Sequence, residues 1–278
     1  MTSIPSKVQS RLVAEIRKFQ PVLASAKSRD VNESDTVIIV TDILSDVFGY
    51  DKYSEITSEH AIRGTYCDLA IRLNDKLEYL IEVKAVGLEL KDQYVKQAVD
   101  YAANLGVDWV ILTNGVSWKM YKVSFSKPID QELVIDLDFL SLNSKSKENL
   151  ECLFFICKEG WIKSAINEYH AQKQVLSRFS IGALLTTDPV LTVIKKELKK
   201  LSPSIKIEND QIKNVIIQEI LKREVVEGEK AEEAKKKINR LMSKSTKPKL
   251  KKVTVGKEEV EKESVPVDII ELPKIIEN

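Results

Sequence analysis

Residues 66–84 decide the fold of this chain, and they read YCDLAIRLNDKLEYLIEVK. Two runs within this stretch, 66–73 and 77–84, are dominated by apolar and strand-favouring side chains. The polar residues Asn74-Asp75-Lys76 separate the runs and are typical of a tight turn. The pattern therefore predicts an antiparallel hairpin of two strands.

Two helices are predicted before this hairpin. Apolar residues recur at helical spacing over residues 6–19, and we expect Pro21 to end that helix because proline has no backbone N–H to donate. A second helical pattern covers residues 37–48, with Asn32 or Ser34 available to cap its start.

A helix and a second hairpin are predicted after the first hairpin. Residues 91–105 return to helical spacing and close at Gly106. Two further strand-like runs, 109–113 and 117–123, flank the turn dipeptide Asn114-Gly115. The order helix, helix, hairpin, helix, hairpin predicts an α/β fold in which helices flank a mixed sheet.

The remainder of the chain is expected to be mainly helical and then largely disordered. We predict a first domain over residues 1–130, a helical C-terminal region over 131–226, and a charged, largely disordered tail over 227–278. The run from Lys235 to Lys252 contains nine basic residues and no acidic residue. Such a run is either a solvated tail or a segment that contacts DNA phosphates without reading sequence.

Composition excludes several classes of protein. The 278 residues carry 43 basic and 42 acidic side chains, so the net charge of +1 gives no overall attraction to nucleic acid or membrane. Three cysteines favour a reducing compartment, and no apolar run reaches the length of a bilayer span, so we expect a cytoplasmic protein. No GxxxxGK[ST] or GxSxG motif occurs, which argues against a P-loop motor and a serine hydrolase.

The residues most suited to chemistry are acidic and lie in the first hairpin. Asp68 interrupts one apolar strand, and Glu82 and Lys84 flank Val83 at the end of the next. A charge in a half-buried strand is costly unless it is paired or binds a ligand. Carboxylates on adjacent strands can share one Mg²⁺ or Mn²⁺ ion, which prefers oxygen ligands. The alternative is a surface ion-pair cluster on an edge hairpin.

This arrangement resembles the active-site signature of the PD-(D/E)xK nuclease superfamily. The resemblance implies a restriction-endonuclease-like mixed sheet and a metal bound by Asp68, Glu82 and the backbone carbonyl of Val83. It further implies that Lys84 is the catalytic base or an electrostatic helper.

Two further segments are similar to the N-terminal domain of type I restriction enzyme R subunits. One segment is Asn32-Glu33-Ser34-Asp35-Thr36, in which the resemblance places Glu33 near the metal. The other is Gln97-Ala98-Val99-Asp100-Tyr101, a QxxxY element whose Gln97 would lie beside the site. Glu33 is also explained as an acid favoured by a helix N-terminus, and Gln97 as a solvated helix position.

The resemblance implies a metal-dependent DNA endonuclease in restriction or defence, in a stand-alone form without a helicase motor. Its expected partners are DNA and a methylase or motor subunit, with no membrane; the sequence does not set the oligomeric state. Two other classes of function stay open, a nucleic-acid-binding module that does not cleave and an accessory subunit of a restriction-modification-like complex.

Overall fold

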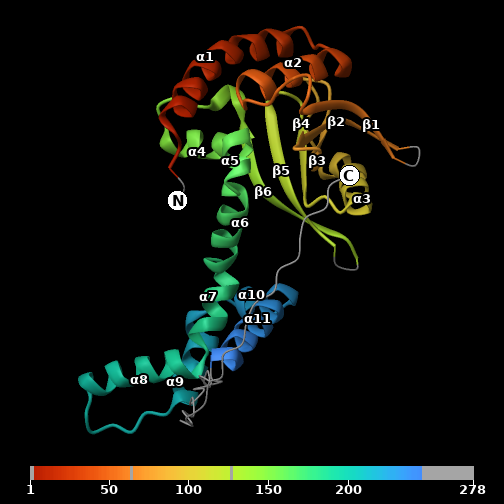
Figure 1. Cartoon of the computed structure of the whole chain (residues 1–278). Coiled ribbons are helices and arrows are strands. Elements are labelled where there is room, and N and C mark those ends of the chain that lie inside the picture. Colours follow the sequence, from red (N-terminus) through yellow and green to blue (C-terminus); the bar gives the residue numbers. More distant parts are fainter. Residues whose placement is uncertain (1–2, 63–64, 126–127, 246–278) are drawn as a thin grey trace, which may run out of the picture. The chain divides into compact units, whose positions relative to one another are not determined.

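The chain divides into two compact units, Met1–Ile181 and Gly182–Asn278. They are seen in a computed structural model, which describes residues 3–62, 65–125 and 128–245 (Figure 1).

The first unit combines one sheet with helices. Its helices are α1 (Ser6–Ser28), α2 (Glu33–Asp46), α3 (Asp92–Leu105), the 3-10 turn η1 (Phe139–Ser141), α4 (Lys147–Ile156), α5 (Lys158–Ile162) and α6 (Ala165–Val175). Its strands are β1 (Ile56–Ile62), β2 (Thr65–Leu73), β3 (Lys76–Val83), β4 (Trp109–Thr113), β5 (Ser117–Ser124) and β6 (Asp130–Asp138).

The six strands form a single mixed sheet in the order β1-β2-β3-β4-β5-β6. β3 and β4 pair in parallel, whereas the other neighbours pair antiparallel. The parallel pair requires a crossover, which α3 supplies. The expected α/β class, a mixed sheet flanked by helices, is confirmed.

Helices cover both faces of this sheet. One core packs side chains of α1, α2 and α4 against alternate strand residues such as Ile81 and Ile111. The other core packs α3 against the intervening residues, such as Leu80 and Leu112. Because strand side chains alternate between faces, Glu82 lies on the α3 side of β3.

Both predicted hairpins are present. Asn74 and Asp75 form the two-residue turn of the first hairpin, with φ angles of 50° and 64°. Positive φ angles at both positions are required for a turn whose twist matches that of the two strands. The predicted helix ending at Gly106 is also confirmed, since Gly106 adopts a left-handed conformation with a φ of 68°.

Pro21 does not end the first helix, contrary to the expectation. α1 continues to Ser28 with Pro21 inside it. The apolar face continues too, because Leu23 and Ala26 are fully buried. The free energy gained by burying Leu23 and Ala26 offsets the cost of the helix hydrogen bond that proline removes.

Strands β1 and β6 are not anticipated by the sequence pattern. β1 reads ITSEHAI and has apolar residues mainly at its ends, so it shows no period-two alternation. β6 begins at Asp130, where the sequence predicts the change to a helical region. Because β6 pairs with β5, residues 131–138, the start of the region predicted to be helical, are extended.

The second unit is helical. Its described elements are α8 (Asp188–Leu201), α9 (Asn209–Val215), the π-helical turn η2 (Ile216–Ile220), α10 (Arg223–Val226) and α11 (Glu229–Ser245), and α7 (Arg178–Leu185) contains the boundary between the units. A small core is formed by Leu191, Ile212 and Ile216. The segment 227–278, expected to be a largely disordered tail, thus contains the helix α11, and residues 246–278 lie outside the described part.

Within the described residues, none of the helices has the length and apolarity needed to cross a membrane.

Replacing Pro21 by alanine should stabilise the first unit. Pro21 is exposed, so the change removes no packing and restores a helix N–H donor. A gain of about 2 kcal/mol is expected after allowing for the greater freedom of the unfolded chain. All three tryptophans lie in this unit, so urea unfolding followed by their fluorescence measures it. The control Pro5→Ala, before the helix, should change stability by less than about 1 kcal/mol; an equal effect of both changes would contradict the account.

Candidate metal site

Asp68 and Glu82 lie opposite one another on the paired strands β2 and β3. Leu69 pairs with Ile81 in the antiparallel register, so one step further along the ladder Asp68 faces Glu82. Glu82 is only 7% exposed, and Asp68 is half-buried. The backbone N–H of Val83 donates to Asp68 Oδ2 at 2.7 Å, which fixes one oxygen of that carboxylate.

Lys84 joins this pair to a third acid. Its Nζ donates to Glu82 Oε1 at 2.7 Å and lies 3.6 Å from Glu33 Oε2. Glu33 is the first residue of α2, whose start is capped by Asn32: the Asn32 side chain accepts from the backbone N–H of Asp35 at 2.9 Å. The cap therefore sets where α2 begins and presents Glu33 to the end of β3.

The environment makes both carboxylates harder to ionise. Burial raises the pKa of Asp68 above its ordinary value, despite the hydrogen bond from Val83. Burial also raises the pKa of Glu82, and the neighbouring charge of Asp68 raises it further against the hydrogen bond from Lys84. Two buried like charges side by side are the arrangement that a bound cation relieves.

Lys84 is held in its charged form. Burial lowers its pKa, but the hydrogen bond to Glu82 and the charges of Glu82, Glu33 and Asp68 together raise the pKa above its ordinary value. The ammonium is therefore protonated at neutral pH.

The donor set fits a divalent cation that keeps some of its ligands as water. Asp68, Glu82 and Glu33 carry three negative charges against one positive charge on Lys84, and the resulting charge of −2 matches Mg²⁺. Within residues 3–62, 65–125 and 128–245, no group of three or more His, Cys, Asp or Glu side chains gathers closely enough to hold a metal. A two-carboxylate site suits Mg²⁺, which often binds proteins through one or two carboxylates.

A loop after β3 is fixed by two buried polar residues that the sequence pattern does not single out for this role. Thr36 is fully buried; its hydroxyl accepts from the backbone N–H of Val86 at 3.1 Å and donates to the carbonyl of Asn32 at 2.7 Å. The Asn114 side chain donates to the carbonyls of Val86 and Leu88 at 3.3 and 2.9 Å. The Asn114-Gly115 dipeptide signals a turn, but not this contact.

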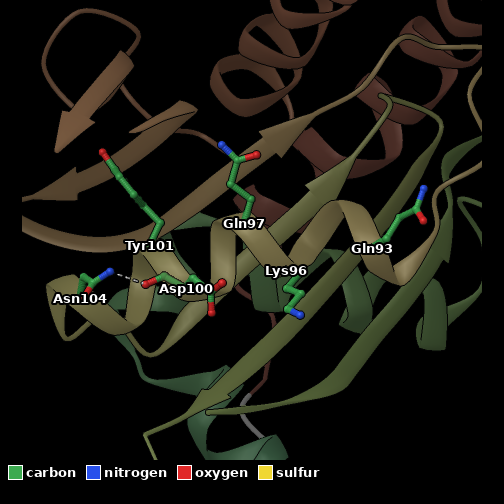
Figure 2. A pocket seen from close by; sticks show the side chains of 6 residues that line it. All are labelled: Gln93, Lys96, Gln97, Asp100, Tyr101 and Asn104. Atoms are coloured by element: carbon green, nitrogen blue, oxygen red, sulfur yellow. Dashed lines mark hydrogen bonds between the residues drawn. The ribbon is translucent and has the colours of Figure 1, made fainter. Parts of the chain in front are cut away.

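Gln97 is not joined to the carboxylates. It is exposed on α3, and it makes no side-chain hydrogen bond within the described part of the chain. It lines a shallow groove of about 420 Å³ on that helix, together with Gln93, Lys96, Asp100, Tyr101 and Asn104. Figure 2 shows Gln97 and Tyr101 projecting to the same side of α3. The structure thus brings Glu33, Asp68, Glu82 and Lys84 together, whereas a role for Gln97 stays a prediction.

A mixed sheet carrying these acids is consistent with the PD-(D/E)xK superfamily. Residues 39–134, about a third of the chain, match the family model described as type I restriction enzyme R protein N terminus, the family that the motifs resemble. Asp68, Glu82, Lys84 and Gln97 fall within the matched segment, and Glu33 precedes it. No match was found among curated proteins or among solved structures.

The substitution Asp68→Asn should stabilise the metal-free protein at neutral pH. A carboxyl whose pKa is raised on folding contributes stability that is present at low pH and is lost as the pH rises through the raised pKa. The amide carries no charge, so the variant should melt at or above the wild-type temperature in chelator, with a flatter dependence on pH. The wild type should therefore melt at a lower temperature at neutral than at mildly acidic pH, and the variant should keep only the smaller part of this dependence that burial of Glu82 supplies. A variant that melts below the wild type at neutral pH would show that the Asp68 charge is stabilising.

The substitution Thr36→Val should loosen the loop after β3. It leaves the buried N–H of Val86 without its acceptor, at an expected cost of about 1–3 kcal/mol. Thr36→Ser keeps the hydroxyl and should restore most of the protection of the Val86 amide against hydrogen exchange. Equal exchange at Val86 in the wild type and the valine variant would mean that the hydroxyl does not hold the loop.

Proposed function

We propose that this chain is a Mg²⁺-dependent nuclease that hydrolyses phosphodiester bonds of DNA in restriction or defence. One observation carries the proposal: Asp68 and Glu82 face each other on paired strands, and Lys84 lies 2.7 Å from Glu82. The family of residues 39–134 supports a role in restriction, and with it DNA as the substrate. A methylase or motor subunit is the proposed protein partner.

In the proposed reaction Asp68 and Glu82 hold the cation, with the backbone carbonyl of Val83 as a further oxygen ligand, and Glu33, expected from the resemblance to lie near the metal, acts through its ion pair with Lys84. A bound Mg²⁺ (or Mn²⁺) polarises the scissile phosphate and lowers the pKa of a water molecule. The raised pKa values of both carboxyls mean that protons compete for the same oxygens at acidic pH.

Lys84 is proposed to stabilise negative charge on the reacting phosphate. Because its pKa is raised, Lys84 is poorly suited to accept a proton and well suited to act as a fixed positive charge. Its side chain is 17% exposed, so part of it is open to solvent, from which a phosphate can approach.

A plasmid-nicking assay tests the activity. Wild-type protein should nick supercoiled DNA with Mg²⁺ and not with a chelator, and Glu82→Gln should be inactive because it removes a metal ligand. The chain offers a matched control in Glu89→Gln, since Glu89 and Lys91 repeat the Glu-x-Lys spacing in an exposed loop. Full activity of Glu82→Gln, or an equal loss in both variants, would refute the site assignment. DNA retention without nicking by the wild type would refute the nuclease itself.

Replacing Lys84 by methionine should separate metal binding from catalysis. Methionine keeps the length of the side chain but removes its charge, so nicking should slow about a hundredfold or more. Calorimetric titration should show that the variant binds Mg²⁺ with equal or higher affinity, because the carboxylates lose the compensating charge of Lys84. Lost metal binding with no further catalytic effect would instead make Lys84 a structural partner of the carboxylates.

A further inference from the structure

Helix α11 of the second unit has two faces of different chemistry. Ala231 and Ala234 are buried, and Ile238 and Met242 line a groove of about 730 Å³ within the same unit. These residues recur at helical spacing, so one face of α11 is apolar; its first half is buried in the unit and its second half borders the groove.

The opposite face is basic and exposed. Lys236, Lys237 and Arg240 are all exposed, and within the described residues none of the three forms an ion pair with an acid. At 1.5 Å of rise per residue, Lys236 and Arg240 lie about 6 Å apart along one side of the helix. The acids of α11, in contrast, are confined to its beginning, at positions 229, 232 and 233.

Several other lysines of the same unit form ion pairs, whereas Lys196 and Lys199 of α8 are exposed and, among the described residues, have none. On α8, Lys200 pairs with Glu197 at 2.7 Å and Lys195 pairs with Glu208 at 3.1 Å. On α11 itself, Lys235 pairs with Glu232 at 2.8 Å. Within the described residues Lys236, Lys237 and Arg240 form no ion pair, although Lys235 and then the charge of Lys236 lower the pKa of Glu232 one turn earlier. The like charges of the basic face repel one another until an anion binds.

The ligand that fits this face is a polyanion with regularly spaced charges. Closely spaced cations on one side of a rigid helix match a row of phosphates, whereas a single small anion would engage only one or two of them. The basic run continues in the sequence beyond this face, through Lys244, Lys247, Lys249, Lys251 and Lys252.

An anionic membrane fits this helix less well. Helices that lie on membranes insert their apolar face into the lipid, but half of the apolar face of α11, at Ala231 and Ala234, is buried in its own unit.

We infer that the exposed basic face of α11, formed by Lys236, Lys237 and Arg240, binds the phosphate backbone of DNA without reading its sequence. The inference rests on the proposed function only for the choice of DNA as the polyanion. It assigns the second unit the task of holding the duplex, which is separate from the carboxylate site of the first unit.

DNA binding by the full chain in chelator tests the inference, because no cleavage is required. The triple variant Lys236→Gln, Lys237→Gln, Arg240→Gln keeps good helix formers and removes three charges. The logarithm of the affinity falls with the logarithm of the salt concentration, and each phosphate contact contributes about 0.9 to the steepness of that fall. On random-sequence duplex DNA the slope should therefore become shallower by about two to three in the variant. The matched control Lys196→Gln, Lys199→Gln, Lys206→Gln removes three exposed charges elsewhere in the unit and should change the slope by less than about 1.

An unchanged slope in the α11 variant, or equal losses in variant and control, would overturn the inference, provided that circular dichroism shows both variants folded. Retention on phosphatidylglycerol vesicles but not on DNA would also overturn it and identify a membrane instead. DNA binding that depends on α11 in a protein that never nicks DNA would support the inference while refuting the proposed nuclease.

Discussion

The burial of two like charges at adjacent positions is the constraint on which the account of this protein depends. Asp68 and Glu82 face each other across a strand pair, and burial raises the pKa of both. Folding alone gains nothing from such a pair, since uncharged side chains would fill the same positions at lower cost. A divalent cation between β2 and β3 supplies a physical reason for both acids to be there.

Much of the surrounding structure fixes the end of β3. The parallel pairing of β3 with β4 makes α3 cross one face of the sheet, and the chain must first turn away from the carboxylates. Thr36 and Asn114 fix that turn through hydrogen bonds to the loop backbone. Because Thr36 and Glu33 lie one turn apart on α2, the same helix positions both the loop and the acid that approaches Lys84.

The elements with strong local signals were predictable from sequence. Both hairpins have apolar runs and favoured turn residues, and α3 ends at a glycine that adopts a left-handed conformation. The expectation for Pro21 was wrong, because burial of Leu23 and Ala26 depends on tertiary packing that a local rule does not include. β1 and β6 carry little alternation and owe their conformation to the strands they pair with.

The candidate site also contains residues that were predictable from the sequence and residues that were not. Asp68, Glu82 and Lys84 stand out because charges interrupt apolar strands, and the register brings them together as expected. Thr36 and Asn114 could not be assigned to the site region, since their roles are contacts with a backbone distant in sequence. Helix α11 was not predicted, because its many charged residues favour a disordered tail, whereas the burial of Ala231 and Ala234 depends on packing within the second unit.

The central claim is that Asp68 and Glu82 together bind one divalent cation. Crystals grown with Mn²⁺ and measured at wavelengths around its absorption edge test this directly, because anomalous density locates the ion without reference to activity. The account predicts one peak between the two carboxylates, absent from Glu82→Gln crystals grown in the same way. Density elsewhere, or a site between β2 and β3 that holds no manganese at saturating concentration, would contradict it.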